Sequence, residues 1–225
     1  MAAKFGLDHK LLGTFLMFLV LQPFAATSRI VKPASLQNLE PGQHRGCGIS
    51  NIIVQTTFNG TEVDDFKFFP GNLRWTNFPV TYGYVPGSSV PNGLTVQAVI
   101  AAVEAAFKVW EGAVPKFAFK KANPGDTPNI KIQFTRLPGR YYGYGYAPPN
   151  GLVSIDNDHT YWSAGSTPKY YELDLQSGLM HEFGHALGLD HSTDQSAVMN
   201  DTLIAGTTKR VLAQDDKDGI QKLYA

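Results

Sequence analysis

Alternating apolar and polar positions predict two β-strands in the middle of the chain. Residues 78–85 carry the first alternation, and one face of it holds Val80, Tyr82 and Tyr84. Residues 130–134 carry the second, and its apolar face holds Ile130, Ile132 and Phe134. A period of two places successive side chains on opposite sides of a sheet, so each segment is expected to bury one face.

A longer segment between these strands has the period of an α-helix. Its apolar residues recur every three or four positions, at Val96, Val99, Ile100, Val103, Phe107 and Trp110. This spacing forms one stripe along a helix, and such a stripe normally packs against a sheet. The stripe therefore predicts a core helix that needs no cofactor.

A second helix is expected from Leu173 to Leu187, and it carries polar chemistry on one face. The residues that should anchor it in the core are Leu179, Phe183 and Ala186. His181 and His185 lie four positions apart, so they share the opposite face. From there they can offer two imidazole nitrogens to one metal ion.

Residues 181–191 read His-Glu-Phe-Gly-His-Ala-Leu-Gly-Leu-Asp-His, an H-E-x-x-H-x-x-G-x-x-H pattern. Glu182 directly follows the first histidine, a position from which a carboxylate can take a proton from a water beside the metal. Gly188 tolerates the left-handed backbone that ends a helix, and the turn brings His191 round as a third ligand. Three histidines leave one tetrahedral position open, which predicts a catalytic zinc site.

A bare H-E-x-x-H pattern also arises by chance on amphipathic helices, where each histidine is an ordinary core or surface residue. The glycine and the third histidine, both in register, make the longer pattern specific to zinc proteases. Two other functions remain open: a secreted protein that binds zinc without turnover, and a structural zinc module. The structural module needs a closed site with four ligands, and only Cys47 could supply the fourth.

The pattern at residues 181–191 resembles that of the metzincin clan of zinc endopeptidases. Members of the clan carry a methionine in a tight turn beneath the metal, and Met199 looks like that residue, although alone it would be an ordinary core methionine. Ser192, directly after the third histidine, is similar to the matrixins, the matrix metalloproteinase family. The resemblance implies an α/β (α+β) domain with a mixed twisted sheet, two long helices and a small C-terminal subdomain after Gly188. It also implies hydrolysis of peptide bonds with Glu182 as general base and no covalent intermediate.

Both ends of the expected domain resemble plant-type matrixins. Residues 66–75 are similar to an F-F-P-G-x-x-R-W pattern at the domain start, and residues 215–224 are similar to a D-D-x-x-G-I-Q-x-L-Y closing helix. In the family, the first aspartate of that helix pairs with the amino terminus made by propeptide removal, which implies this role for Asp215. Residues 144–149 resemble the edge strand beside the cleft, whose free backbone groups would bind an extended polypeptide substrate by strand addition.

The amino-terminal residues have the pattern of a secretory signal peptide. Basic residues precede the apolar run at residues 11–21, and small residues follow it. A membrane anchor is the alternative, but a spanning helix needs about 20 apolar residues. We therefore predict a secreted, extracellular protein without a membrane anchor. Its expected parts are a signal peptide at residues 1–28, a short propeptide or linker at 29–65, and the catalytic domain at 66–225.

Length and charge limit the other functions. A chain of 225 residues with 43% hydrophobic and 17% charged residues can bury one full core and leaves no room for a second large domain. The formal net charge is zero, and no basic run stands out. Nucleic acid is therefore not an expected partner, and we expect a monomer.

Cys47 is the only cysteine in the chain, which excludes an internal disulfide. Residues 45–48, Arg-Gly-Cys-Gly, resemble the P-R-C-G cysteine switch of matrixin propeptides, in which the thiolate fills the open position on zinc. The resemblance therefore makes Cys47 a zinc ligand of a zymogen. Gly46 separates the arginine from the cysteine, and Asn51 stands where the family has an aspartate, so an idle free cysteine remains the alternative.

The chain lacks most of the residues with which matrixins hold a second, structural zinc and calcium. Tyr144 and Ser154 stand at two of the histidine positions, and the loop at residues 135–143 has no histidine or acid. Asp156 and Asp158 match calcium ligands, but a histidine replaces the glutamate that follows them, so the calcium ligand set is incomplete. We expect one zinc, the catalytic ion, and a loop held by the packing of its tyrosines.

Overall fold

The computed structural model describes residues 44–47, 64–139 and 141–225. The chain divides into two units, Met1–Gln37 and Asn38–Ala225, and every described residue belongs to the second. The predicted signal peptide and most of the predicted propeptide lie outside the described residues, so their boundaries stay predictions.

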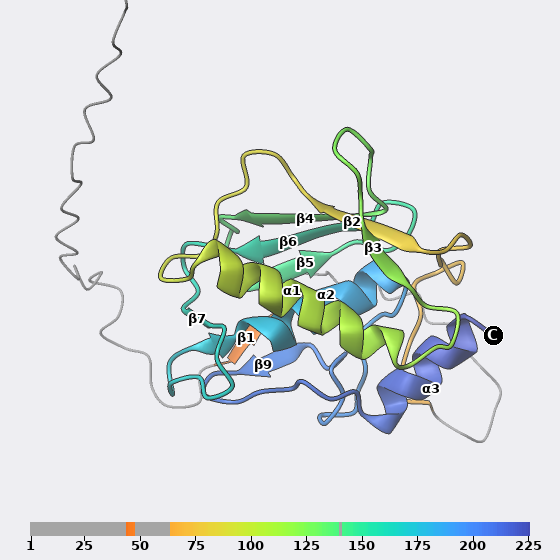
Figure 1. Ribbon diagram of the computed structural model, residues 1–225. Coiled ribbons are helices and arrows are strands. Elements are labelled where there is room, and N and C mark those ends of the chain that lie inside the picture. The colour runs from red at the N-terminus through yellow and green to blue at the C-terminus, as the bar shows by residue number, and fades with distance from the viewer. Residues whose placement is uncertain (1–43, 48–63, 140) are drawn as a thin grey trace, which may run out of the picture. The chain divides into compact units, whose positions relative to one another are not determined.

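Five strands of the described part form one mixed sheet, in the spatial order β3-β2-β4-β6-β5 (Figure 1). In that order, their bounds are Phe119–Lys121, Val80–Tyr84, Ile130–Thr135, Leu152–Asp156 and Gly143–Gly145. The first four run parallel, and β5 lies antiparallel to β6 at the edge. The predicted mixed sheet is confirmed, but the edge strand is shorter than residues 144–149, because residues 147–150 form a turn in which the Asn150 N–H donates to the Ala147 carbonyl at 3.1 Å.

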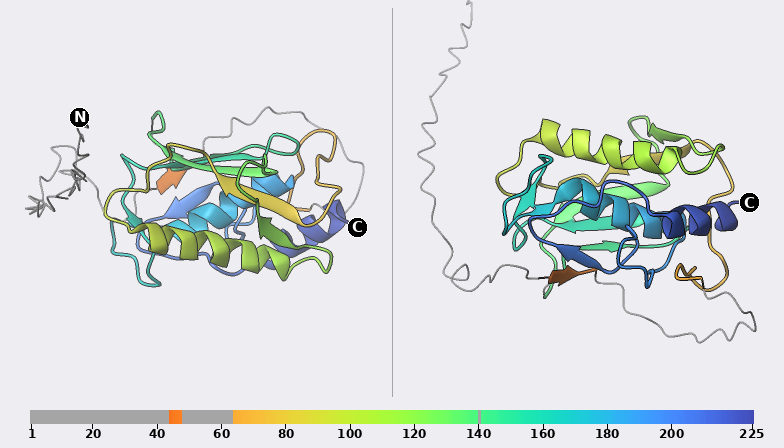
Figure 2. Two further views of the ribbon diagram at one scale, coloured as in Figure 1. Left: turned by 45° about the horizontal axis from the view of Figure 1, so that its top comes forward. Right: turned by 90° about the horizontal axis from the view of Figure 1, so that it is seen from below.

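Three helices are described, α1 Val96–Glu111, α2 Leu175–Leu187 and α3 Gln214–Leu223. Helix α1 packs against α2, and α2 also packs against β5 and β6, so the two long helices lie side by side over one face of the sheet (Figure 2). Two small sheets complete the described fold: β1 His44–Gly46 with β9 Thr202–Ile204, and β7 Trp162–Ser163 with β8 Leu173–Asp174.

Four of the six residues of the predicted stripe on α1 are buried: Val99, Val103, Phe107 and Trp110. Val96, the first residue of the helix, is 56% exposed, and Ile100 is only half-buried. Two alanines outside the predicted stripe, Ala102 and Ala106, are buried instead. Thr95 caps the helix, since its hydroxyl oxygen accepts a hydrogen bond from the Ala98 N–H at 3.2 Å.

The alternating segments behave as predicted, with β2 and β4 each burying one face. The buried residues of the two strands are Val80, Tyr82, Ile130, Ile132 and Phe134, while Tyr84 is half-buried. Between the helices, the rings of Phe107 and Phe183 stack at a centroid distance of 4.0 Å. This contact ties α1 to the helix that carries the histidines.

Helix α2 begins two residues later than predicted, because Leu173 and Asp174 pair with β7 as a strand. Asp174 is the N-cap, and its carboxylate accepts the Ser177 N–H at 2.9 Å. The Arg210 guanidinium also binds this buried carboxylate, so the helix start is tied to the segment after β9.

The same helix ends at Gly188 as predicted, in a left-handed conformation with φ of 108°. Its N–H donates to the His185 carbonyl at 2.9 Å. A Cβ at this position would overlap the Leu73 carbonyl oxygen, so the turn requires glycine for space as well as for conformation.

The segment after Gly188 folds under α2 and closes on α3. The buried Asp216 carboxylate of α3 accepts backbone N–H groups from Val198, Met199 and Ala213 at 2.8 to 3.0 Å. One carboxylate therefore fixes the turn that contains Met199. Among the described residues, no helix combines the length and the apolar character that a membrane span requires.

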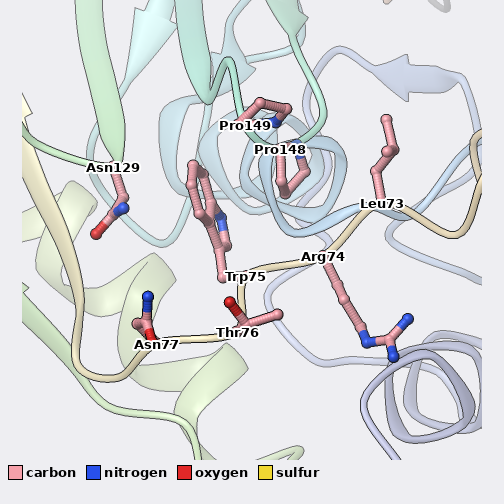
Figure 3. Close-up of a pocket in the computed structure, with 8 residues that line it drawn as sticks. All are labelled: Leu73, Arg74, Trp75, Thr76, Asn77, Asn129, Pro148 and Pro149. Carbon is pink, nitrogen blue, oxygen red and sulfur yellow. The ribbon is translucent and has the colours of Figure 1, made fainter.

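A surface pocket of about 300 Å³ lies beside Trp75 (Figure 3). Its lining residues are Leu73, Arg74, Trp75, Thr76, Asn77, Asn129, Pro148 and Pro149. None of them is a predicted site residue. Trp75 connects this pocket to α2, because its indole N–H donates to the Ala186 carbonyl at 2.8 Å.

Candidate metal centre

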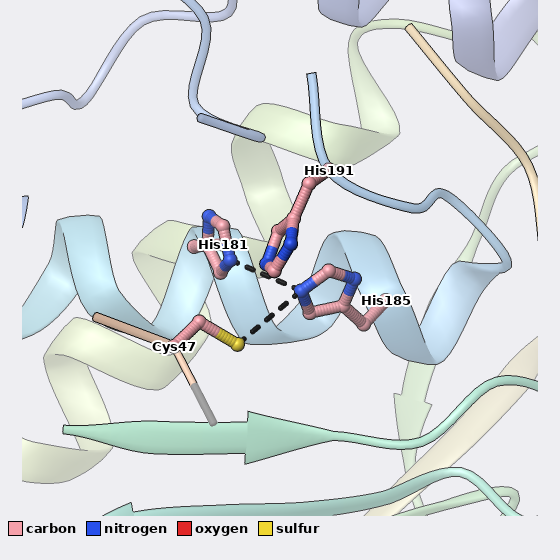
Figure 4. A group of neighbouring side chains, drawn as sticks. All are labelled: Cys47, His181, His185 and His191. Carbon is pink, nitrogen blue, oxygen red and sulfur yellow. Dashed lines mark hydrogen bonds between the residues drawn. The ribbon is translucent and has the colours of Figure 1, made fainter. Parts of the chain in front are cut away.

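Helix α2 brings the two predicted histidine ligands together, and the turn at Gly188 adds the third (Figure 4). Nitrogen atoms of His181, His185 and His191 and the Cys47 sulfur all lie within 4.8 Å of one another. All four side chains are buried. The sequence separates Cys47 from His185 by 138 positions, so the cluster is assembled by the fold.

Backbone carbonyls fix how two of the imidazoles face the centre. His181 Nδ1 lies 2.7 Å from the Val198 carbonyl oxygen, and His185 Nδ1 lies 2.8 Å from the Leu189 carbonyl oxygen. A carbonyl oxygen only accepts, so each Nδ1 carries a proton and each Nε2 presents a lone pair. The Nε2 atoms of both rings therefore point into the cluster as acceptors.

Burial keeps these imidazoles neutral. It lowers the pKa of His181 to about 3 and the pKa of His185 well below its ordinary value. It also lowers the pKa of His191, although the nearby carboxylates of Asp190 and Asp201 oppose the shift. Neutral histidine is the form that binds a metal ion.

The arrangement fits a zinc ion. His181 Nε2 and His185 Nε2 are only 3.0 Å apart, and two lone pairs at that distance repel each other unless a cation lies between them. A proton is not available at neutral pH, given the lowered pKa values. The two ring nitrogens of His191 are buried and have no hydrogen-bond partner within the described part of the chain. Histidine nitrogens and a cysteine sulfur are the donors that zinc prefers.

Glu182 is fully buried beside the cluster. The Cys47 thiol donates to Glu182 Oε2 at 3.6 Å, whereas Oε1 has no hydrogen-bond partner among the described residues. Burial raises the pKa of Glu182 well above its ordinary value. Gly143 of β5 makes room for this side chain, since a Cβ there would lie 2.5 Å from Glu182 Oε1.

Cys47 reaches the cluster at the end of strand β1. The Cys47 N–H donates to the Asp201 carbonyl at 3.2 Å, and β1 pairs with β9. On its other side, Cys47 bridges Gly143 in the parallel direction. The thiol sulfur lies 3.5 Å from His185 Nε2, so the only cysteine of the chain occupies the side of the cluster that faces the edge strand.

Met199, which the metzincin resemblance assigns to a turn beneath the metal, packs against α2 at Gly184. It is buried, and a Cβ added at Gly184 would overlap its sulfur atom. The absent side chain at Gly184 therefore lets the turn pack directly against the helix.

The aspartates that match calcium ligands make contacts within the protein. The Asp156 carboxylate accepts the Leu137 N–H at 3.0 Å and the His159 N–H at 2.8 Å, and it lies 3.4 Å from the His159 ring. Asp158 forms an ion pair with Arg136 at 3.4 Å. Tyrosine packing was expected to hold this loop, but Asp156 also holds it, through the N–H groups of Leu137 and His159.

Tyrosine packing accounts for a smaller part of the loop than expected. The rings of Tyr141 and Tyr144 pack at 5.4 Å, but Tyr141 and Tyr146 are more than two-fifths exposed. Tyr142 is fully buried and packs against His181. The sequence did not predict that Tyr142 lies beside the metal centre. The one feature that could have indicated it is its position directly before Gly143–Gly145, the edge strand.

The family resemblance implies that Asp215 pairs with the amino terminus made by propeptide removal. In the structure, Asp215 binds Phe66, the first residue of the predicted catalytic domain. The Phe66 backbone N–H donates to Asp215 Oδ1 at 2.9 Å, and the Ser192 hydroxyl donates to Asp215 Oδ2 at 2.6 Å. Asp215 therefore joins the segment at Phe66 to the residue that follows His191.

Comparisons with known proteins agree with this geometry. The sequence model of the matrixin family matches residues 74–225. The chain is 34% identical over 196 residues to metalloendoproteinase 1 from Glycine max, covering 79% of this chain and 62% of that protein.

Two animal proteins are similar at a comparable level. Interstitial collagenase from Sus scrofa is 32% identical over 77% of this chain, and matrilysin from Homo sapiens is 32% identical over 72% of it. The chain spans 38% and 63% of the lengths of these two relatives. The family model alone covers more than half of the chain, and the metal-binding pattern lies within that match. The chain therefore belongs to the matrixin family.

Proposed function

We propose that this protein is a zinc-dependent endopeptidase whose metal is held by His181, His185 and His191. The observation that carries the proposal is the pair of Nε2 lone pairs that face each other at 3.0 Å inside a buried cluster. Family membership supports the same conclusion. When bound, zinc would act as a Lewis acid that polarises the scissile carbonyl and favours deprotonation of a water.

Glu182 is the proposed general base. Its carboxylate takes a proton from the attacking water and then gives that proton to the leaving amine, so the peptide bond is hydrolysed without a covalent intermediate. A raised pKa suits this double role, because the group has to hold the proton between the two steps. The edge strand β5, which borders Glu182 through Gly143, would bind the substrate as an extended strand.

We propose that Cys47 inhibits this activity in the full-length chain. Its sulfur lies in the same cluster as the three histidines, and its backbone occupies the free edge of β5 at Gly143. In this position the thiolate would take the metal position needed for hydrolysis, and the β1 segment would take the place of substrate. The full-length chain would then be a latent zymogen that is activated by removal of this segment.

Secretion is a separate proposal, and it rests on the signal-peptide pattern in residues 1–28. Mass spectrometry of protein recovered from the culture medium of expressing cells tests it. A mature amino terminus near residue 29 is expected, and an intact amino terminus retained inside the cells would contradict it.

Casein hydrolysis by the full-length chain carrying Cys47→Ser tests the proposed activity. We expect cleavage that a zinc chelator stops and added zinc restores. Adding Glu182→Ala should lower the rate by about a thousandfold or more while zinc content and fold are retained. Zinc binding with no cleavage in either variant would instead indicate a zinc-binding protein without turnover. Loss of zinc only when Cys47 is replaced would indicate a structural four-ligand module.

A further inference from the structure

Tyr142 lies at the metal centre, but the mechanism above gives it no role. It directly precedes β5, and its carbonyl accepts the Asp156 N–H at 2.9 Å, which fixes its backbone against β6. Its side chain is fully buried. The residue that follows it, Gly143, is the one that contacts both Glu182 and Cys47.

Three neighbours hold the Tyr142 ring in place. It packs edge-to-face against the His181 imidazole at 6.0 Å and against the Trp162 indole at 6.2 Å. A Cβ added at Gly178 would lie 2.8 Å from Trp162 Cη2 and 3.7 Å from Tyr142 Cδ2. The absence of a side chain at Gly178 therefore makes room for the Trp162 ring. Packed against His181 and Trp162, the tyrosine ring has little freedom to turn its hydroxyl away.

The Tyr142 hydroxyl and Glu182 Oε1 are both buried side-chain oxygens without a hydrogen-bond partner in the described part of the chain. Leaving such a group unsatisfied costs about 1–3 kcal/mol, so a native structure rarely keeps two of them at one site without a purpose. A phenol can donate, and a carboxylate oxygen can accept. A small group with one oxygen, such as a water, can satisfy both at once.

The electrostatics keep Tyr142 a donor. Burial raises the pKa of its phenol well above the ordinary value, and the nearby acidic groups of Glu182, Cys47 and Asp201 raise it further. The Tyr142 ring packs against His181, the residue before Glu182, and Gly143, the residue after Tyr142, lies against the Glu182 carboxylate. Glu182 and the phenol therefore belong to the same local environment. A neutral O–H group is thus available beside the general base.

We propose that Tyr142 is a catalytic residue whose hydroxyl donates a hydrogen bond to the oxygen of the water that Glu182 deprotonates. This inference rests on the proposed peptidase function. As the water oxygen bonds to the scissile carbonyl carbon, its proton moves to Glu182 and the carbonyl π electrons move to the carbonyl oxygen. Tyr142 keeps its own proton throughout. Its hydrogen bond strengthens as the water oxygen gains negative charge, which lowers the barrier.

Tyr142→Phe in the Cys47→Ser chain tests the proposal, because it removes one oxygen and keeps the ring. The substrate is a quenched fluorescent peptide built on a casein cleavage site. We expect kcat to fall by about ten- to a hundredfold with KM within about a factor of two, in line with the loss of one hydrogen bond made in the transition state. Tyr82→Phe is the matched control: Tyr82 is also buried, but it packs on Phe107 in the core. It should leave kcat unchanged.

A binding measurement separates catalysis from structure. The affinity of a phosphinic peptide, which mimics the tetrahedral adduct, should fall by the same factor as kcat/KM in Tyr142→Phe. The affinity of a cleaved product peptide, the zinc content and the thermal midpoint should not change. Unchanged turnover, or a loss of zinc or of fold in Tyr142→Phe, overturns the role of Tyr142 while hydrolysis by the Cys47→Ser parent still upholds the peptidase. Absence of hydrolysis in that parent overturns both.

Discussion

At the scale of single residues, two backbone carbonyls decide what the histidines can do. Because the Val198 and Leu189 carbonyls take the Nδ1 protons, His181 and His185 turn their lone pairs toward each other. The motif spacing puts these rings on one face of the helix, but these carbonyls choose which nitrogen faces the metal.

The lowered histidine pKa values predict the pH below which zinc is released. Only neutral histidine binds zinc, so protons displace the metal only when the pH approaches the pKa of the ligands. With the pKa of His181 at about 3, against an ordinary value of 6.5, zinc should stay bound well below pH 6.5. Zinc content after dialysis over a pH series measures this. A release midpoint at or above 6.5 would contradict it, and His159→Gln, outside the cluster, should leave the midpoint unchanged.

Cys47 gives a second prediction at this scale. A serine hydroxyl is a poor zinc ligand at neutral pH, so the full-length Cys47→Ser chain should cleave a quenched peptide at least about tenfold faster than the unmodified chain. A mercurial should activate the unmodified chain and leave Cys47→Ser unaffected. Equal activity of the two untreated chains would show that Cys47 is not a switch.

At the scale of elements, the packing of α2 against the Met199 turn outweighs helix propensity. Alanine is favoured over glycine inside a helix by about 1 kcal/mol, but a Cβ at Gly184 would overlap the Met199 sulfur and lie 3.1 Å from Trp110 Cζ2. Gly184→Ala should therefore lower the free energy of unfolding by about 1–3 kcal/mol.

Chemical denaturation of a double-mutant cycle checks this assignment. In a Met199→Ala background the sulfur is gone, so Gly184→Ala should be less destabilising than in the parent by about 1 kcal/mol or more. An equal cost in both backgrounds would mean that Met199 is not the obstacle.

At the scale of the whole molecule, hydrogen bonds to the Asp156 carboxylate hold the loop before β5 in place. The Asp156 carboxylate joins Leu137 to His159 across two connections of the sheet. Replacing it with alanine leaves two N–H groups without their acceptor, so Asp156→Ala should cost about 2–4 kcal/mol in the free energy of unfolding. Asp158→Ala is the control: it removes an exposed ion pair with Arg136 and a 3.9 Å contact with His159 Nε2, and it should cost less than about 1 kcal/mol. Similar losses of unfolding free energy in the two variants would show that the Asp156 hydrogen bonds do not stabilise the loop.

The same contacts bear on the metal content of the protein. With Asp156 engaged by N–H groups and with Tyr144 and Ser154 at two of the family's histidine positions, we expect one zinc per chain. Elemental analysis of dialysed protein measures the count. Two zincs per chain, or a thermal midpoint that rises with added calcium, would show that this region binds a metal after all.

The sequence by itself determined the features that depend on near neighbours. The four-residue spacing of His181 and His185, the alternation in β2 and β4, and the helix end at Gly188 follow from local backbone geometry, which a short run of residues encodes. The family follows from the same run, because its pattern is long and specific.

Only the tertiary structure decided which distant groups meet. The thiol of Cys47 lies beside His185 because β1 pairs with β9, and Asp156 serves as a loop clamp because β6 carries it to the N–H groups of Leu137 and His159. The sequence pattern gives Tyr142 no mark that separates it from the other loop tyrosines, but the fold buries its ring against His181. Such contacts depend on how whole elements pack, and no local period in the sequence records which side chains that packing will bring together.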